Sequence, residues 1–311
     1  MSAEDTISAE PADAPLRASR WGDLAAIAVC TLAWGTTWYA ITHQLGVVDP
    51  VVSVTYRFTL AAALLFVWCA LRRESMALTG AQHMAALGIG LFTFGIDYPL
   101  VYWAEERVTS AVVAVVFAAL AFVNLVTFRI AFGQRASLLA WGAAALGVVG
   151  VALLSWEEIV TAQLSERALV GVGLTFAGVL AAAVGNVFAR RSELAGASVA
   201  ASTGWAMAYG AMLLALFALV TGRTWAFEFT FPYVVSLLHL AVVGSVIAFI
   251  LYYGLARRRG YATASYISAL TPPLAMLVSA MFEGKSWGLF ALGGVALVLA
   301  GQALLLRARK A

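Results

Sequence analysis

Charged residues are scarce in this sequence. Asp, Glu, Lys and Arg together make up 11% of its 311 residues, whereas soluble globular domains carry about 25%. Hydrophobic residues make up 63% of the chain, and its mean hydropathy is +0.91. So little charge cannot cover a water-exposed surface. The composition therefore excludes a soluble globular protein and indicates an integral membrane protein.

Residues that carry out chemistry are also few. The two cysteines, Cys30 and Cys69, fall in separate apolar runs and fit packing roles better than a disulfide. The histidines His43, His83 and His239 lie near different loops or within an apolar run, without an acidic partner. An intramembrane enzyme needs converging acids, bases or metal ligands. We therefore expect no enzyme, no catalytic residue, no metal site and no cofactor.

Apolar runs of about 20 residues, long enough to cross a hydrocarbon core about 30 Å thick, follow one another along the chain. Lipid offers the backbone no hydrogen-bond partner, so these runs are expected to be helices. The predicted spans are 21–42, 51–71, 82–103, 110–130, 138–155, 168–189, 198–220, 231–255, 262–282 and 288–306. The predicted fold class is an all-α integral membrane protein with ten transmembrane helices.

Basic residues are distributed unevenly around these spans. If the amino terminus is cytoplasmic, all but five of the 19 lysines and arginines lie on the cytoplasmic side. The exceptions are Arg57, inside a span, and Arg107, Arg167, Arg223 and Lys285 on the opposite side. This asymmetry predicts a multi-pass membrane protein with both termini in the cytoplasm. The expected location is the bacterial inner membrane. Because the basic residues sit at helix ends and form no patch, nucleic acid is not an expected partner.

The second half of the sequence repeats the first. Residues 142–154 match residues 293–305 at a shift of 151 without a gap, and the shift places Gly150 on Gly301. The predicted domains are a disordered cytoplasmic tail, 1–20, and two five-helix repeats, 21–155 and 168–306. Since five is odd, the second repeat enters the membrane from the opposite face. Inverted repeats are typical of transporters, which bind substrate near the midplane between them. A duplicated membrane protein that carries nothing is the alternative.

Two charged residues are predicted at similar depth inside the membrane. Arg57 lies two turns from the outer end of its span, and Asp97 lies six residues before Trp103. Unpaired charge at this level is expensive. We favour a structural ion pair between Arg57 and Asp97, and the alternative is that either group meets a charged part of the substrate.

The first and sixth spans carry a glycine followed by polar or aromatic residues. Gly35 lies between Trp34 and Trp38, and a shift of 150 places Gly35 on Gly185, which precedes Asn186. Glycine lets helices approach or bend. Gly35 and Gly185 are therefore packing or hinge candidates. Trp38 is a candidate substrate contact, and Asn186 fits either interhelical glue or a substrate contact.

Aromatic residues make up 12% of the chain. Many belong to the belts at the membrane surface, but some are expected deeper, where a buried hydroxyl or indole nitrogen needs a partner. The pairs Tyr98 and Tyr102 in the third span, and Trp205 and Tyr209 in the seventh, are each spaced by four residues. We predict that these four side chains line a cavity.

The ninth span contains adjacent prolines, Pro272 and Pro273. Proline removes a backbone donor and displaces a carbonyl, and such a break is tolerated beside a wet cavity. Pro272 and Pro273 are therefore hinge candidates, and Ser268 and Thr271 are candidate substrate contacts. A kink that serves packing alone is the alternative.

Several of these features together resemble the EamA-type repeats of the drug/metabolite transporter superfamily. The resemblance covers about residues 24–306 and rests on Trp34-Gly35, Arg57, Ser268-Ala-Leu-Thr-Pro272, Phe282-Glu283-Gly284 and the ending from Gly293 to Gly301. The first repeat departs from the pattern, with Ala121 at the position of Pro272 and Gln134 where an acidic residue is usual. The aromatic content and Asp97-Tyr98-Pro99 are most similar to the branch of YddG-type aromatic amino acid exporters.

The resemblance implies export of aromatic amino acids and related small metabolites from the cytoplasm by alternating access. The alternative is a proton-coupled exporter of organic cations, for which Asp97 would be the membrane carboxylate. The expected partners are a small-molecule substrate and the lipid bilayer. A monomer is compatible with the sequence, and composition leaves uniport, exchange and proton antiport open.

Overall fold

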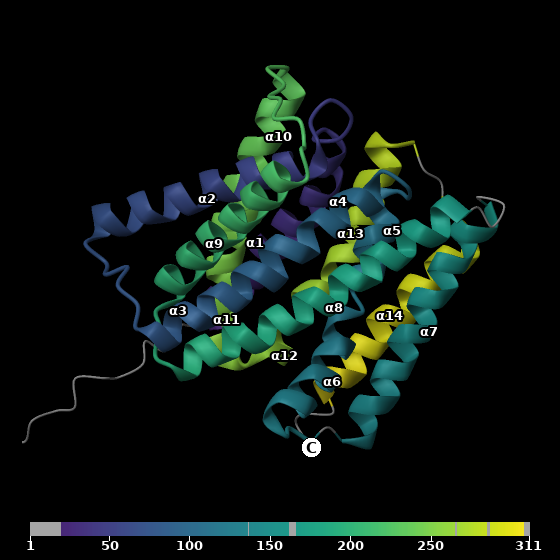
Figure 1. The fold of residues 1–311 in the computed structure, drawn as a ribbon. Helices are drawn as coiled ribbons and strands as arrows, with labels where there is room; N and C mark the ends of the chain where they lie inside the picture. The colour runs from purple at the N-terminus through teal and green to yellow at the C-terminus, as the bar shows by residue number, and fades with distance from the viewer. Residues whose placement is uncertain (1–19, 136, 162–165, 265, 285–286, 308–311) are drawn as a thin grey trace, which may run out of the picture.

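The computed structural model describes residues 20–135, 137–161, 166–264, 266–284 and 287–307, and within these ranges the regular structure is helical (Figure 1). The helices are α1 (Arg20–Thr42), α2 (Pro50–Arg72), α3 (Gly80–Ile89), η1 (Gly90–Asp97), α4 (Tyr98–Glu105), α5 (Ser110–Phe117), α6 (Leu120–Phe132), α7 (Leu138–Thr161), α8 (Glu166–Leu194), α9 (Val199–Val220), α10 (Phe231–Ala241), η2 (Val242–Ile247), α11 (Ala248–Arg259), α12 (Tyr261–Ala264), α13 (Tyr266–Phe282) and α14 (Leu289–Arg307). Of the predicted tail, 1–20, the structure describes only Arg20.

Seven helical segments of the described chain are long and apolar enough to cross a membrane. They are Trp21–Thr42, Pro50–Arg72, Gly80–Glu105, Ser110–Phe132, Glu166–Leu194, Val199–Val220 and Phe231–Arg259. The other three predicted spans correspond to shorter apolar helices at Leu138–Gly150, Leu270–Phe282 and Leu289–Gly301. The prediction of a multi-pass helical protein is confirmed, and the count of ten spans stays a prediction.

The third and eighth predicted spans each contain a π-helical segment in place of a continuous α-helix. These segments are η1, between α3 and α4, and η2, between α10 and α11. A shift of 151 places residues 90–97 on residues 241–248, which include the whole of η2. The two halves therefore share an unusual local distortion as well as sequence. π-Helical turns insert a residue into a helix and are frequent at functional sites.

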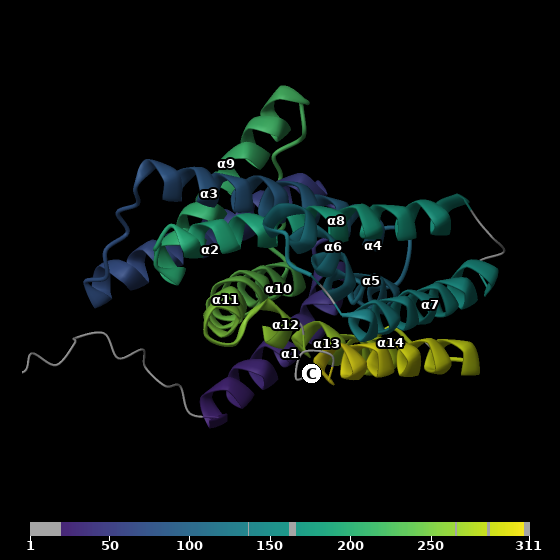
Figure 2. The ribbon, with the colours of Figure 1, turned by 90° about the horizontal axis from the view of Figure 1, so that it is seen from below.

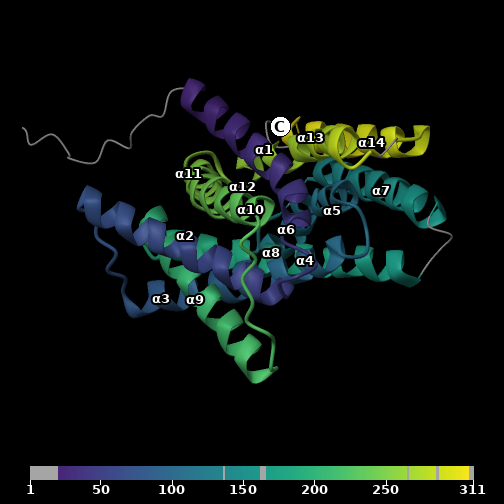
Figure 3. The same ribbon diagram turned by 90° about the horizontal axis from the view of Figure 1, so that it is seen from above.

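Helices α7 and α14 pack against each other along one side of the molecule, away from α2, α3 and α9 (Figures 1 to 3). Glycine allows the close contact. A Cβ at Gly150 would lie 2.6 Å from the carbonyl oxygen of Gly294, and a Cβ at Gly301 would lie 2.7 Å from that of Ala143. The shift of 151 exchanges these two contacts, so the crossing is reciprocal. Its pairing also requires α7 and α14 to run in opposite directions.

Helix ends follow ordinary capping chemistry. The side chain of Asp49 accepts a hydrogen bond from the backbone amide of Val51, and Pro50 occupies the first turn of α2. Thr79 and Gln82 form a capping box at the start of α3. Pro272 and Pro273 lie inside α13, which is assigned as helix without interruption from Tyr266 to Phe282. The break predicted at these prolines is therefore not a gap in the helix.

Candidate functional site

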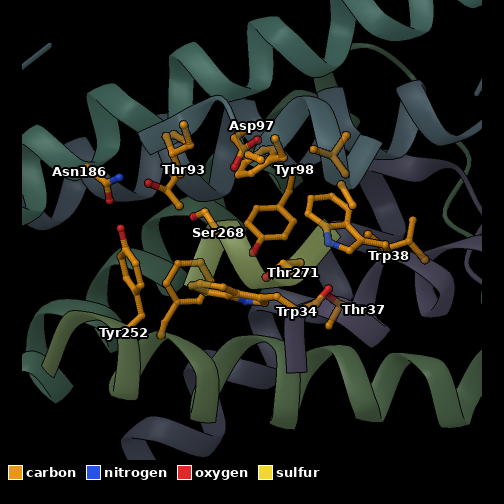
Figure 4. Close-up of a pocket in the computed structure, with 18 of the residues that line it drawn as sticks. Trp34, Thr37, Trp38, Thr93, Asp97, Tyr98, Asn186, Tyr252, Ser268 and Thr271 are labelled. Atoms are coloured by element: carbon orange, nitrogen blue, oxygen red, sulfur yellow. The ribbon is translucent and has the colours of Figure 1, made fainter. Parts of the chain in front are cut away.

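A cavity lies where the two halves meet (Figure 4). Its walls come from seven predicted spans: the first to the fourth, the sixth, the eighth and the ninth. The lining residues are Trp34, Thr37, Trp38, Ile41, Arg57, Thr93, Asp97, Tyr98, Val101, Ala114, Phe117, Ala118, Leu120, Ala182, Asn186, Phe249, Tyr252, Tyr253, Ser268 and Thr271. Its volume of about 80 Å³ has room for several waters at about 10–15 Å³ each. A larger molecule would have to displace the walls.

Aromatic rings form much of the cavity wall. The ring centroid of Trp34 lies 5.3 Å from that of Tyr252 and 5.5 Å from that of Phe249. The Trp38 ring lies 5.4 Å from that of Phe117. These separations are those of tilted and edge-to-face ring pairs. The Trp34 indole nitrogen donates to the carbonyl oxygen of Gly244 at 3.2 Å, whereas that of Trp38 is buried without a hydrogen-bond partner.

The repeat relation makes the cavity asymmetric. The shift of 151 places Tyr98 on Phe249, Val101 on Tyr252, Phe117 on Ser268 and Leu120 on Thr271, and all eight residues line the cavity. Three of these pairs exchange an apolar side chain of the first repeat for a hydroxyl side chain of the second, and the pair of Tyr98 and Phe249 does the reverse. Asn186 adds an amide from the second repeat. Equivalent backbone positions therefore present a more apolar wall on one side and hydroxyl and amide groups on the other.

Arg57 holds the two halves together at the cavity. Its side chain is 1% exposed, and its Nε donates to the Ser245 hydroxyl of η2 at 3.0 Å. Its guanidinium carbon also lies 4.5 Å from the ring centroid of Tyr98, a cation–π contact. Gly244 leaves the space, because a Cβ there would come within 3.3 Å of Arg57 Nη2. Arg57 therefore joins α2 of the first repeat to η2 of the second.

The ion pairs of the described chain do not include a direct one between Arg57 and Asp97, although both residues line the cavity, so the structural pair stays a prediction. The carboxylate of Asp97 instead faces α8, where a Cβ at Gly178 would lie 2.8 Å from Oδ1. Asp97 is 3% exposed and Oδ1 has no hydrogen-bond partner. Arg57 bonds to the Ser245 hydroxyl of η2 and packs over the Tyr98 ring, while Asp97 lines the cavity.

The second repeat supplies polar groups from α8, α11 and α13. Asn186 donates to the Asn124 side chain of α6 at 3.3 Å, and Figure 4 shows the Tyr252 hydroxyl directed toward Asn186. Asn186 is thus both interhelical glue and part of the cavity wall. The Thr271 hydroxyl donates to the Ile267 carbonyl at 2.7 Å, which leaves its oxygen free to accept.

Three predicted contacts lie outside the cavity. The Trp205 indole nitrogen donates to the Met76 carbonyl oxygen at 2.7 Å, and the Tyr209 hydroxyl lies 2.8 Å from His83 Nδ1. These bonds tie α9 to α3 and to the segment before it, so both side chains have packing roles. Tyr102 is 0% exposed and also does not line the cavity.

The hinge candidates are tightly packed glycines and prolines outside the cavity lining. A Cβ at Gly35 would lie 2.4 Å from the Leu274 side chain of α13, and a Cβ at Gly185 would lie 1.9 Å from the Thr93 hydroxyl. Both glycines therefore allow close contact between the halves. Their hinge role, like that of Pro272 and Pro273, stays a prediction.

The sequence patterns missed several lining residues, among them Trp34, Thr37, Thr93, Phe249 and Tyr253. A usable signal was present for Phe249, since it is the repeat partner of Tyr98. Thr93 carries no comparable signal. It becomes recognisable only when η1 is seen to turn this part of the third span toward the cavity.

A helical protein that crosses the membrane several times and encloses an asymmetric cavity between related halves belongs to the class of membrane transporters. Comparison with known proteins defines the family. The model of the EamA-like transporter family matches residues 20–156 and 169–307, and the chain belongs to this family. This confirms the resemblance to EamA-type repeats.

Relatives extend over most of the chain. The protein PagO of Salmonella typhimurium is 22% identical over 253 residues, 79% of this chain and 80% of PagO. The uncharacterized inner membrane transporter YedA of Escherichia coli K12 is 26% identical over 256 residues, 82% of this chain and 81% of YedA. One solved crystal structure shares the fold with a TM-score of 0.71 at 18% identity, covering 94% of this chain and all of that one. The chain is thus a membrane transporter, and YedA is named as a transporter of the inner membrane.

Proposed function

We propose that this transporter exports aromatic amino acids and related small metabolites from the cytoplasm by alternating access through the central cavity. The asymmetry of the cavity carries the proposal. The rings of Trp38 and Phe117 suit an aromatic side chain, while Asn186, Ser268 and Thr271 suit the polar end of the same molecule. Arg57 offers a positive charge to the carboxylate of an amino acid substrate. The small volume agrees with a site whose walls part when substrate enters.

The second candidate is a proton-coupled exporter of organic cations. The unpartnered Asp97 carboxylate and the surrounding rings favour it, since both attract cations. Arg57 opposes it, because a fixed positive charge lines the same cavity. We therefore rank an aromatic zwitterion above an organic cation.

Uptake into proteoliposomes distinguishes the two candidates. Labelled tryptophan, threonine and a quaternary ammonium dye are offered separately to the reconstituted protein, with and without a pH gradient. Saturable tryptophan uptake that exceeds threonine uptake supports amino acid export. Dye transport in the presence of inert amino acids would replace it with the cation exporter.

A matched pair of variants tests the polar wall. Asn186→Leu removes a cavity amide and the bond to Asn124, whereas Asn124→Leu removes the same bond from the side away from the cavity lining. We expect Asn186→Leu to raise the KM for tryptophan by roughly tenfold, the effect of one lost polar contact of about 1.4 kcal/mol. Equal effects of both variants would assign Asn186 to packing alone.

A further inference from the structure

Unpartnered polar atoms form a string between the cavity and one end of α4. They are Asp97 Oδ1, Arg57 Nη1, the Tyr102 hydroxyl, and both carboxylate oxygens of Glu105, all buried and without a hydrogen-bond partner. Asp97 lines the cavity, and Glu105 is the last residue of α4. Eight residues of helix separate them, a rise of about 12 Å. Buried polar atoms without partners call for an explanation, such as water or an ion.

Among these groups, the Glu105 carboxylate is the most costly to bury. It is 8% exposed, although a fully charged carboxylate without hydrogen bonds is costly at that depth. It also lies at the carboxyl end of a helix, where the backbone dipoles oppose negative charge. A bound proton removes the charge and supplies a donor.

The charges around Glu105 do not neutralise the negative charge of its carboxylate. Glu283, which directly follows α13, and Arg57 on α2 are the charges that act on it. Arg57 is also the cation nearest Asp97 in the cavity and is bonded to Ser245. On α8, Arg167 donates to the backbone carbonyl of Glu106, and α1 has its charged residues, Arg20 and Asp23, at its other end. One guanidinium therefore faces several carboxyl groups.

Glu283 connects Glu105 to the surface. It is partly exposed, and its carboxylate accepts hydrogen bonds from Ser110 at 2.9 Å and from Ser279. Ser110 opens α5, five residues after the end of the third-span helix. The bond between Ser110 and Glu283 thus joins the outer ends of the two repeats, and the buried carboxyl group of Glu105 lies near Glu283.

We infer that Glu105 and Asp97 are proton-binding sites on one pathway from the outer face to the cavity, so that protons moving inward drive export. The inference rests on the proposed transport function and on cytoplasmic termini. A hydronium ion at the outer face gives its proton to the Glu105 carboxylate and leaves as water. The proton passes by the Tyr102 hydroxyl and water to the Asp97 carboxylate. It is released to the cytoplasm when the cavity opens inward.

The variant Glu105→Gln tests the pathway, and Glu106→Gln is the matched control. Glu106 is the next residue, and its carboxylate is partly exposed and paired with Arg107. In proteoliposomes, Glu105→Gln should lower tryptophan accumulation driven by a pH gradient roughly tenfold, the size of an ordinary coupling between two sites. It should leave exchange of labelled for unlabelled tryptophan intact. Glu106→Gln should behave as the wild type in both assays.

The outcomes separate the two proposals. Normal exchange with accumulation indifferent to the pH gradient, or driven by a sodium gradient, overturns the proton pathway and leaves the transport function standing. If no substrate of the panel exchanges, the proposed function fails. Infrared spectroscopy of the reconstituted protein at neutral pH then still decides the proton site. The carbonyl stretch of protonated carboxyl groups should weaken in Glu105→Gln relative to Glu106→Gln, and an unchanged band would refute the site.

Discussion

At the scale of single residues, Arg57 shows how a charge is held inside the membrane without a direct ion pair. Its Nε bonds to the Ser245 hydroxyl, and its guanidinium carbon lies over the Tyr98 ring, 4.5 Å from the ring centroid. Both contacts use the flat shape of the guanidinium, which a lysine ammonium does not share. Arg57 therefore acts as a shaped connector between the repeats as well as a charge.

Arg57→Lys should for this reason lower the stability of the folded protein, although it keeps the charge. We expect a loss of about 1.5–3 kcal/mol, the range for a hydrogen bond to a charged group. Thermal unfolding in detergent measures it. Arg72→Lys makes the same exchange near the end of the same helix, where Arg72 is exposed, and should change little. Equal melting temperatures for the two variants would contradict the connector role.

At the scale of elements, the halves meet through glycines. Gly150 of α7 and Gly301 of α14 make reciprocal contacts with the backbone of the other helix, and Gly244 makes room for Arg57 and Thr37. Lipid provides little hydrophobic drive for helices to associate, so close backbone packing matters more than in water. The π-helical segments η1 and η2 lie at the same contact, since Gly244 of η2 packs against Thr37, and Thr93 of η1 packs against Gly185.

Substitution of Gly150 by alanine tests the α7–α14 contact. The added Cβ would lie 2.6 Å from the Gly294 carbonyl oxygen, and such overpacking costs typically about 1–3 kcal/mol. Gly142→Ala is the control on the same helix, because nothing lies within 4 Å of its Cβ position. It should be neutral or stabilising by up to about 1 kcal/mol. Equal unfolding temperatures for the two variants would show that the helices are not in close contact.

At the scale of the whole molecule, alternating access through the cavity requires opposite orientations of the two repeats. The reciprocal contacts of α7 and α14 require these two helices to be antiparallel. The distribution of arginine and lysine predicts the same for α1 and α8. In that arrangement residue 166 lies on the outer side of the membrane and residue 194 lies on the cytoplasmic side.

Single cysteines at the two ends of α8 test this orientation. The chain is first freed of Cys30 and Cys69, which are buried. A membrane-impermeant maleimide should label Glu166→Cys on intact cells and Leu194→Cys only after permeabilisation. Leu194 is 63% exposed, so reactivity there is not limited by burial. Labelling in the reverse order would show that α8 does not run from the outer face to the cytoplasm as predicted.

Much of the architecture was accessible from sequence because the membrane constrains it strongly. Lipid forces the backbone into helices, so apolar runs predict segments well. Boundaries were less accurate. For example, the predicted span 168–189 is α8, Glu166–Leu194, because a helix continues beyond the apolar run when other contacts support its ends. The prolines of α13 were read as a break, but the assigned helix continues through them.

The candidate site was predicted less well, for a geometric reason. Tyr98 and Tyr102, and Trp205 and Tyr209, have the same spacing in sequence, yet of these four only Tyr98 lines the cavity. Spacing shows which side chains share a helix face, and packing decides which face meets the cavity. The partner of Arg57 was missed for the same reason, since Ser245 lies 188 residues away in sequence.

The sequence by itself determined that this protein is a duplicated helical membrane protein of EamA type, because composition, run length and repeats are local or additive properties of the chain. Only the tertiary structure decided which polar groups meet. It placed Asp97 in the same cavity as Arg57 but without a direct ion pair, and left Glu105 buried beside Glu283. The energies of these groups depend on neighbours from distant segments, and the rotation of each helix about its axis, which brings those neighbours into place, is set by packing of the whole molecule.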